Sequence, residues 1–196
     1  MTRRGFLVAA SAAAANQPLT LAVDQIFNLR ANLTASRLKG QASLWGEASS
    51  EFERCGVRLS GDSRMGEIRL SPGGRPIFTA LNQRAINVYF TDRIPMDWDR
   101  ARALAGVSTR YDNASLCVIA LRYARVNRIP FLAVNTCVHE LLHVITGDIF
   151  RRQTGRFSTE TRELAIDAMA TRLWFGGGCG DVTEAARAYR ARWQRG

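Results

Sequence analysis

Hydrophobic residues recur at helical spacing in a segment that covers residues 131–147. The apolar positions fall at i, i+3, i+4, i+7 and i+11 and continue just past the segment: Val138, Leu141, Leu142, Ile145 and Ile149. Residues at this spacing form one stripe along an α-helix. Pro130 precedes the segment, and Gly147 is a plausible stop. The pattern therefore predicts an amphipathic helix over 131–147, with its apolar stripe toward a core.

A second stripe at helical spacing lies downstream, over residues 160–174. It consists of Ile166, Met169, Ala170 and Leu173. Ser158 or Thr159 is a suitable capping residue at its start, and the glycines at 176–178 are typical of a helix end. We therefore expect a second amphipathic helix over 160–174.

The rest of the chain carries weaker patterns. We expect further helices over 18–38, 42–54 and 181–195. We expect short strands over 55–60 and 66–71, and better-defined strands over 86–91 and 115–121. In the tail helix, Tyr189 and Trp193 lie one turn apart, which favours packing against the domain over a role at a membrane or on nucleic acid.

The first fifteen residues are typical of an export signal. Thr2–Leu7 resembles the twin-arginine consensus, an Ala-rich apolar run follows, and Ala13–Ala15 supplies a cleavage site of the A-x-A type. The alternative interpretation is a disordered or helical N-terminal arm. Cleavage near Asn16 leaves 181 residues (196 − 15), enough for one domain over 16–196. No later stretch is long enough to span a bilayer, so we expect a periplasmic or secreted protein without a transmembrane segment.

The chain is strongly basic, with a formal net charge of +10. Most of this charge is arginine spread along the sequence, since Lys39 is the only lysine. A solvated basic surface is the favoured interpretation, and attraction to acidic substrates or to an anionic envelope surface is the alternative. We expect no nucleic-acid partner, because the chain carries an export signal and lacks a base-reading motif. The sequence leaves the oligomeric state open.

The four cysteines are an even set without metal-binding spacing. Two disulfides in three possible pairings are consistent with an oxidising compartment, and buried free thiols are the alternative: Cys55, Cys117, Cys137 and Cys179. Cys137 lies two residues before His139, but on a helix it points about 200° away from that histidine, which argues against a ligand role.

Both histidines of the chain lie in one pentapeptide, His139-Glu140-Leu-Leu-His143. Positions i and i+4 differ by about 40° around a helix, so the two imidazoles can bind one metal ion. Glu140, about 100° round from His139, can flank that ion. This is the HExxH arrangement of two Zn²⁺ ligands and a general base, although so short a pattern also occurs by chance in ordinary buried helices.

A catalytic zinc site needs a third protein ligand, and no histidine remains to supply it. Glu163 stands twenty positions after His143 (163 − 143), on the helix predicted over 160–174. Asp167 lies one turn further along the same face, where it could orient a ligand imidazole. The alternative for this pair is an ordinary solvated face. Asp148 is a weaker candidate for the third ligand, because it follows His143 so closely.

The HExxH motif followed about twenty residues later by ExxxD resembles the gluzincin zinc metallopeptidases, including thermolysin-like enzymes and minigluzincins. The resemblance covers roughly residues 131–175. It implies an α+β, single-domain zincin-like fold in which a small mixed sheet packs with the HExxH helix and a downstream glutamate helix. It implies zinc ligands His139, His143 and Glu163, a catalytic base at Glu140, and support for the first histidine from Asp167. Thermolysin-like enzymes carry a further histidine that stabilises the transition state, which this chain lacks.

These expectations define three functions that experiment can separate. The first is a zinc metallopeptidase that hydrolyses proteins or peptides outside the cytoplasm. The second is an exported envelope-binding protein on a zincin scaffold, with structural zinc or none. The third is a basic module that binds polyanions without metal. In zincins the strand before the metal helix often forms the rim of the cleft, so 115–121 is either that rim or a central core strand.

Overall fold

The computed structural model describes residues 18–31, 33–95, 105–124, 135–154 and 159–194, with only the backbone described at 148–154 and 159–160. In chain order its elements are β1 (Leu19–Asn28), α2 (Ala35–Arg54), β2 (Val57–Ser60), β3 (Ser63–Gly66), β4 (Ile68–Leu70), β5 (Pro76–Phe78), β6 (Ile86–Thr91), β7 (Gly106–Tyr111), β8 (Ala114–Ala120), α3 (Thr136–Thr154), α4 (Thr159–Trp174) and α5 (Cys179–Trp193). The described residues thus form a mixed α and β structure, which confirms the α+β class. The predicted export signal, residues 1–15, lies outside them.

The main sheet has the strand order β2-β1-β6-β8-β7. The strands β2, β1, β6 and β8 run parallel, and β7 runs antiparallel to β8 at the edge. Strand β1 is long enough to pair with β2 along its first half and with β3 along its second half. The sheet is therefore mixed, as the resemblance implied, and its one antiparallel strand lies at the edge.

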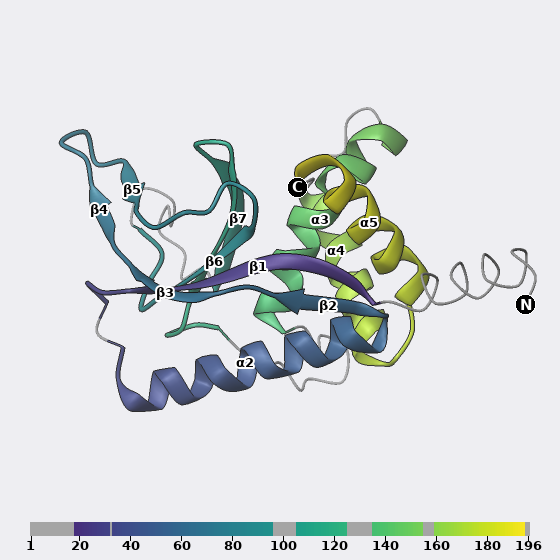
Figure 1. Cartoon of the computed structure of the whole chain (residues 1–196), viewed down its shortest axis with the longest axis horizontal. Helices are drawn as coiled ribbons and strands as arrows, with labels where there is room; N and C mark the ends of the chain where they lie inside the picture. The colour runs from purple at the N-terminus through teal and green to yellow at the C-terminus, as the bar shows by residue number, and fades with distance from the viewer. Residues whose placement is uncertain (1–17, 32, 96–104, 125–134, 155–158, 195–196) are drawn as a thin grey trace, which may run out of the picture.

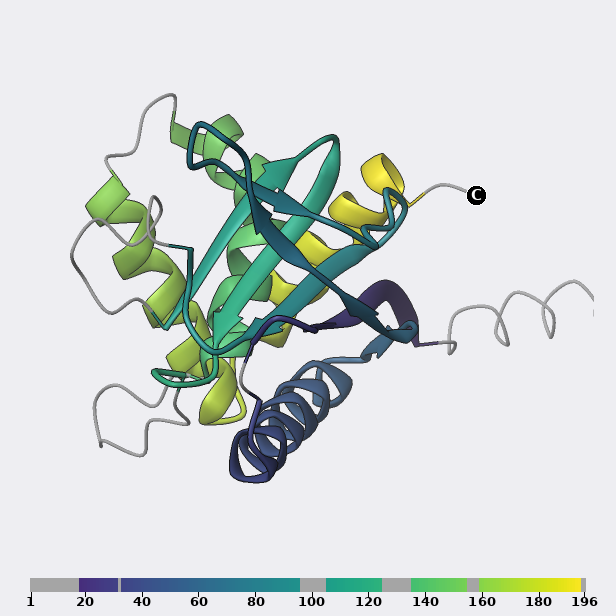
Figure 2. The same cartoon turned by 90° about the vertical axis from the view of Figure 1, so that its left-hand side faces the viewer.

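The helices and the β4–β5 hairpin lie on different sides of the sheet (Figures 1 and 2), which separates two apolar cores. On one face, apolar side chains of α2, α3, α4 and α5 pack against the sheet in one continuous cluster. On the other face, the β4–β5 hairpin contributes Phe78 to a smaller cluster with Tyr89 and Leu116. All residues of β6 and β8 are buried. A strand that is covered on both faces contains a nearly continuous apolar run, and this is why 86–91 and 115–121 were recognisable in the sequence.

The predicted helix over 18–38 is wrong, because β1 occupies residues 19–28. Leu21 and Val23 are buried with the helices, whereas Ile26 is buried on the hairpin side. An inner strand with both faces covered does not alternate cleanly between apolar and polar residues. The spacing of its apolar residues therefore also fitted the pattern of a helix. The helix begins only at Ala35, after Thr34, whose side chain accepts a hydrogen bond from the backbone N–H of Arg37.

The predicted stop of the 131–147 helix is also wrong. Helix α3 continues through Gly147 to Thr154, and its described part begins at Thr136. A single glycine inside a helix costs only about 1 kcal/mol relative to alanine, which the packing of the apolar face can offset. Residues 131–134, which were expected to open this helix, lie outside the described residues. Helix α4 matches its expected range closely.

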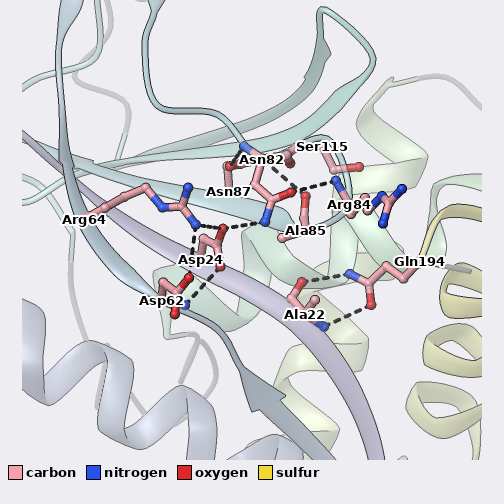
Figure 3. A network of polar contacts seen from close by, with 10 residues as sticks. All are labelled: Ala22, Asp24, Asp62, Arg64, Asn82, Arg84, Ala85, Asn87, Ser115 and Gln194. Atoms are coloured by element: carbon pink, nitrogen blue, oxygen red, sulfur yellow. Dashed lines mark hydrogen bonds and ion pairs between the residues drawn. The ribbon is translucent and has the colours of Figure 1, made fainter. Parts of the chain in front are cut away.

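A buried aspartate joins β1 to two neighbouring segments (Figure 3). Asp24 is 3 % exposed and accepts hydrogen bonds from the Arg64 guanidinium at 2.5 Å, the Asn82 amide at 2.9 Å and the backbone N–H of Asp62 at 3.0 Å. Asn87, fully buried on β6, accepts from the backbone N–H of Asn82 at 2.8 Å. A buried carboxylate needs hydrogen-bond donors, and because β3 and the loop before β6 supply them, the network fixes both segments against β1.

Two of the four cysteines form a disulfide and the other two are buried free thiols, so each of the two alternatives applies to one pair. Cys55 and Cys179 form a disulfide that joins the end of α2 to the start of α5. Cys117 and Cys137 are buried free thiols. At the same junction the hydroxyl of Thr183 donates to the backbone carbonyl of Cys55 at 2.9 Å.

The tail helix packs against the domain, as predicted. Tyr189 of α5 is buried, and its hydroxyl hydrogen-bonds to that of Ser115 on β8 at 2.7 Å. Trp193 stacks under the Arg110 guanidinium of β7, at 3.8 Å from the ring centroid. None of the described helices combines the length and the apolar character that crossing a lipid bilayer requires.

Candidate metal centre

The start of helix α3 is fixed by a buried asparagine. Asn135 is 1 % exposed, and its side-chain oxygen accepts hydrogen bonds from the backbone N–H groups of Cys137 at 2.8 Å and Val138 at 3.4 Å. Its amide nitrogen donates to the backbone carbonyl of Leu44 in α2 at 2.9 Å. The first turn of a helix has N–H groups without partners inside the helix, and Asn135 satisfies two of them. One side chain thus caps α3 and ties it to α2.

Helix α3 turns its apolar stripe into the core between the sheet and the helices, and its histidines lie to one side of that stripe. Val138, Leu141, Leu142 and Ile145 are all buried. The side chains of His139 and His143 remain 16 % and 11 % exposed. Solvent can therefore reach both imidazoles, while their backbone is held by a packed helix.

The side chain of Glu163 on α4 meets both histidines. Its Oε2 lies 3.2 Å from Nε2 of His139 and 3.1 Å from Nε2 of His143, and the two Nε2 atoms are 3.0 Å apart. In the part of the chain that the structure describes, this is the one group of three or more His, Cys, Asp or Glu side chains whose ligand atoms lie within 4.8 Å of one another. The three residues predicted to share a metal ion are therefore brought together.

The separations within this group fit a small tetrahedral ion. Zn²⁺ bonds to imidazole nitrogen and carboxylate oxygen are about 2.0–2.1 Å long, so two ligand atoms on one ion lie about 3.3–3.4 Å apart. The separations of 3.0–3.2 Å differ from this by a few tenths of an ångström. The set of two imidazoles and one carboxylate is also that of known catalytic zinc sites with an open fourth position.

Asp167 holds the first imidazole in the tautomer that metal binding needs. Its Oδ1 lies 2.9 Å from Nδ1 of His139. A carboxylate accepts hydrogen bonds, so it stabilises a proton on Nδ1 and leaves the lone pair of a neutral His139 on Nε2. A metal ion bound between Nε2 of His139, Nε2 of His143 and Oε2 of Glu163 would take the place of the ring proton through which each imidazole otherwise donates to Glu163.

The charges in this cluster shift its pKa values in opposite directions. Hydrogen bonds from His139 and His143 hold the pKa of Glu163 well below its usual range. Burial lowers the pKa of His139, but the hydrogen bond to Glu163 and the nearby carboxylates outweigh it and raise that pKa overall. The three side chains are thus arranged to stabilise Glu163 as an anion, which is the form that binds a metal.

Glu140 occupies a different environment from Glu163. It is only 6 % exposed, and burial raises the pKa of its carboxyl against the opposing effect of His139 and His143. The carboxyl lies against the edge strand β7, where Ser108 hydrogen-bonds to it and Gly106 leaves room for it. A carboxylate with a raised pKa beside a ligand cluster is typical of a general acid–base group.

Strand β7 was not among the predicted strands, although the Asp112-Asn113 pair is a sequence signal for the hairpin turn that joins it to β8. Asp112 and Asn113 both have positive φ, of 45° and 64°, and Tyr111 pairs with Ala114. Two such residues between β-forming runs are typical of a tight hairpin turn. Because β8 pairs with both β6 and β7, residues 115–121 belong to a central strand. The edge strand on this side of the sheet is β7.

Two other candidate ligands can now be placed. Cys137 is fully buried in the helix-side core, which excludes it from the cluster as its helical position predicted. The backbone of Asp148 continues α3, and its side chain lies outside the described residues. No family model matches the sequence, and a search of curated proteins finds no match either.

Proposed function

We propose that this chain is a zinc-dependent peptidase, in which His139, His143 and Glu163 bind the metal and Glu140 is the catalytic base. The observation that carries the proposal is the meeting of two imidazole nitrogens and one carboxylate oxygen at 3.0–3.2 Å, beside a buried carboxyl group with a raised pKa. The order of the strands, with one antiparallel edge strand next to the metal helix, supports a zincin-like fold.

A bound zinc ion would polarise the scissile carbonyl and lower the pKa of a water molecule to about 7. The Glu140 carboxylate would accept a proton from the attacking water and deliver it to the nitrogen of the leaving amine. Asp167, through its hydrogen bond to Nδ1, would keep His139 oriented during the reaction. These assignments give a role to each of the five residues His139, Glu140, His143, Glu163 and Asp167.

The substrate we propose is an extended protein or peptide segment that lies beside β7. This strand is paired with β8 on one side only in the described residues, so the backbone groups of its other edge are available to an added strand. The N-terminal signal supports export by the twin-arginine route to the periplasm or medium. The alternative of a structural zinc site in a binding protein gives no role to a buried carboxyl at position 140.

Metal analysis and hydrolysis together test the proposal. We expect the purified mature protein to contain about one zinc per chain and to cleave peptides from a broad library. Glu163→Ala should reduce zinc content more than Asp167→Ala, whereas Glu184→Ala, on the exposed side of α5, should leave it unchanged. Glu140→Gln should retain zinc and lose about 10²–10⁴-fold in rate, because it keeps the shape of the side chain without the proton acceptor.

Three outcomes would contradict the proposal. Protein that contains no zinc, and takes none up, supports the polyanion-binding alternative. Stoichiometric iron in place of zinc would point to another use of two histidines and a carboxylate. Equal hydrolysis by wild type and Glu140→Gln on an authentic substrate would exclude Glu140 as the base.

A further inference from the structure

The edge strand β7 presents one face to the metal helix. Gly106 and Ser108 are two residues apart and therefore share that face. A Cβ atom added to Gly106 would lie 2.6 Å from Oε1, 2.7 Å from Cγ and 2.9 Å from Cδ of Glu140. Carbon atoms in contact are normally about 3.5–4.0 Å apart, so any other residue at this position would displace the Glu140 side chain.

The backbone at Gly106 does not itself require a glycine. Its φ is not among the positive values of the chain, so alanine could adopt the same conformation. Glycine inside a strand weakens it and often marks a close approach by another group. The group that approaches closely here is the Glu140 carboxyl. Glycine is therefore needed at position 106 because it leaves space, and not because of its backbone conformation.

Ser108 supplies the polar contact on the same face. Its hydroxyl hydrogen-bonds to the carboxylate of Glu140, which is otherwise removed from water. The adjoining strand β8 contributes the thiol of Cys117, 3.6 Å from the backbone carbonyl of Glu140. A flexible glutamate side chain is thereby confined by the strand on one side and by its own helix on the other.

We propose that Gly106 and Ser108 are positioning residues for Glu140, the glycine by leaving space for its carboxyl and the serine by orienting it. The inference rests on the proposed function, in which Glu140 is the base. It implies that β7 has a second role besides that of a substrate edge: it sets where the proton acceptor stands. A displacement of about 1 Å in a reacting group can lower a rate by about 10²-fold, so such positioning matters.

A stability cycle tests the contact without any use of catalysis. Gly106→Ala should lower the melting temperature of the wild-type protein by roughly 3–10 °C, because it overpacks a closed space. In the Glu140→Ala background the carboxyl is gone, and Gly106→Ala should cost much less. Equal losses in both backgrounds would show that Gly106 does not act through Glu140, and would overturn its part of the inference.

Kinetics test the effect on the base. Ser108→Ala should lower kcat by about 10-fold or more with little change in KM, because a hydrogen bond to a charged group is lost. Ser108→Thr keeps the hydroxyl and should restore kcat. Thr109→Val, on the opposite face of β7, is the matched control and should match wild type. In the Glu140→Gln background neither Gly106→Ala nor Ser108→Ala should reduce the residual rate further.

The outcomes separate the inference from the proposed function. If the wild type binds zinc and hydrolyses peptides but Ser108→Ala retains full kcat, the positioning role of Ser108 is wrong and the peptidase proposal stands. If the wild type shows neither zinc nor hydrolysis, the proposed function fails and the positioning of a base fails with it. The stability cycle then still reports whether Gly106 and Glu140 compete for space.

Discussion

Glu51 gives the folded protein a pH dependence that can be calculated from its surroundings. It lies on the face of α2 that packs into the helix-side core and is only 5 % exposed. Its Oε1 has no hydrogen-bond partner within the described part of the chain. Burial raises the pKa of this carboxyl to about 7, because the attraction of Arg54 is too weak to offset the loss of water, and Glu47 adds repulsion. The folded protein therefore holds Glu51 protonated in mildly acidic solution.

The size and sign of the effect follow from linkage. A group whose pKa rises from 4.5 in the unfolded chain to about 7 in the folded protein contributes about 3 kcal/mol. Because the folded state binds the proton more tightly, this stability is fully present below pH 4.5 and is lost as the pH rises to about 7. Glu51→Gln carries no charge at any pH, so it should avoid this loss.

Urea unfolding of wild type and Glu51→Gln at pH 4.5 and pH 8 measures the effect. The stability of the variant relative to wild type should increase by about 3 kcal/mol between the two pH values, or roughly 6–12 °C in melting temperature. Contributions from groups other than Glu51 are common to the two proteins and cancel in this difference. Glu53→Gln, at an exposed position on the same helix, is the control and should track wild type. A constant difference between Glu51→Gln and wild type across this range would refute the reasoning.

Two further predictions concern the contacts that hold α3 and α5 in place. Replacing both Cys55 and Cys179 with serine opens a bridge across a sequence separation of 124 residues. The chain-entropy model gives a loss of about 5 kcal/mol, measurable by urea unfolding, and an unchanged midpoint would contradict it. Asn135→Ala should cost about 2–4 kcal/mol, since it removes a helix cap and the donor to Leu44. Asn135→Ser keeps an uncharged capping oxygen but not the donor to Leu44, and should cost less; equal losses in the two variants would show that the cap contributes little.

The ligand cluster was predictable because its residues are tied to helix geometry. The spacing of His139 and His143 fixes their direction once the segment is helical, and the buried stripe beside them made the helix recognisable. The partner carboxylates needed more than spacing. The choice of Glu163 and Asp167 rested on the twenty-residue spacing, on their common helix face and on the family resemblance together, since a polar pair on a helix face is common without a metal. Asp148 shows the limit of sequence reasoning, because only the folded helix shows that the chain does not turn back after Gly147.

The surroundings of Glu140 were not predictable, because they depend on pairing between distant strands. Strand β7 is short and partly exposed, and its sequence, Gly-Val-Ser-Thr-Arg-Tyr, gives little apolar signal. Its position beside α3 follows from the hairpin with β8, whose turn at Asp112 was not recognised. Strand β1 was misassigned for the opposite reason, an excess of apolar residues. In both strands the apolar or polar character of the residues follows from which elements cover each face, and the local sequence does not reveal those neighbours.

The precision of the cluster depends on how α4 is held against α3. Glu163 itself is about half exposed, so little packing around its side chain can fix its position. The packing lies one turn further along, where Ile166 and Ala170 are buried in the same core as Leu142 of α3. The hydrogen bond from His139 to Asp167 adds a second, polar link between the helices. A metal bound to all three ligands would join the same two helices a third time, so its binding energy would also stabilise the fold. The cluster is thus assembled from the side that is already packed, while the half-exposed carboxylate of Glu163 leaves its other side in contact with solvent.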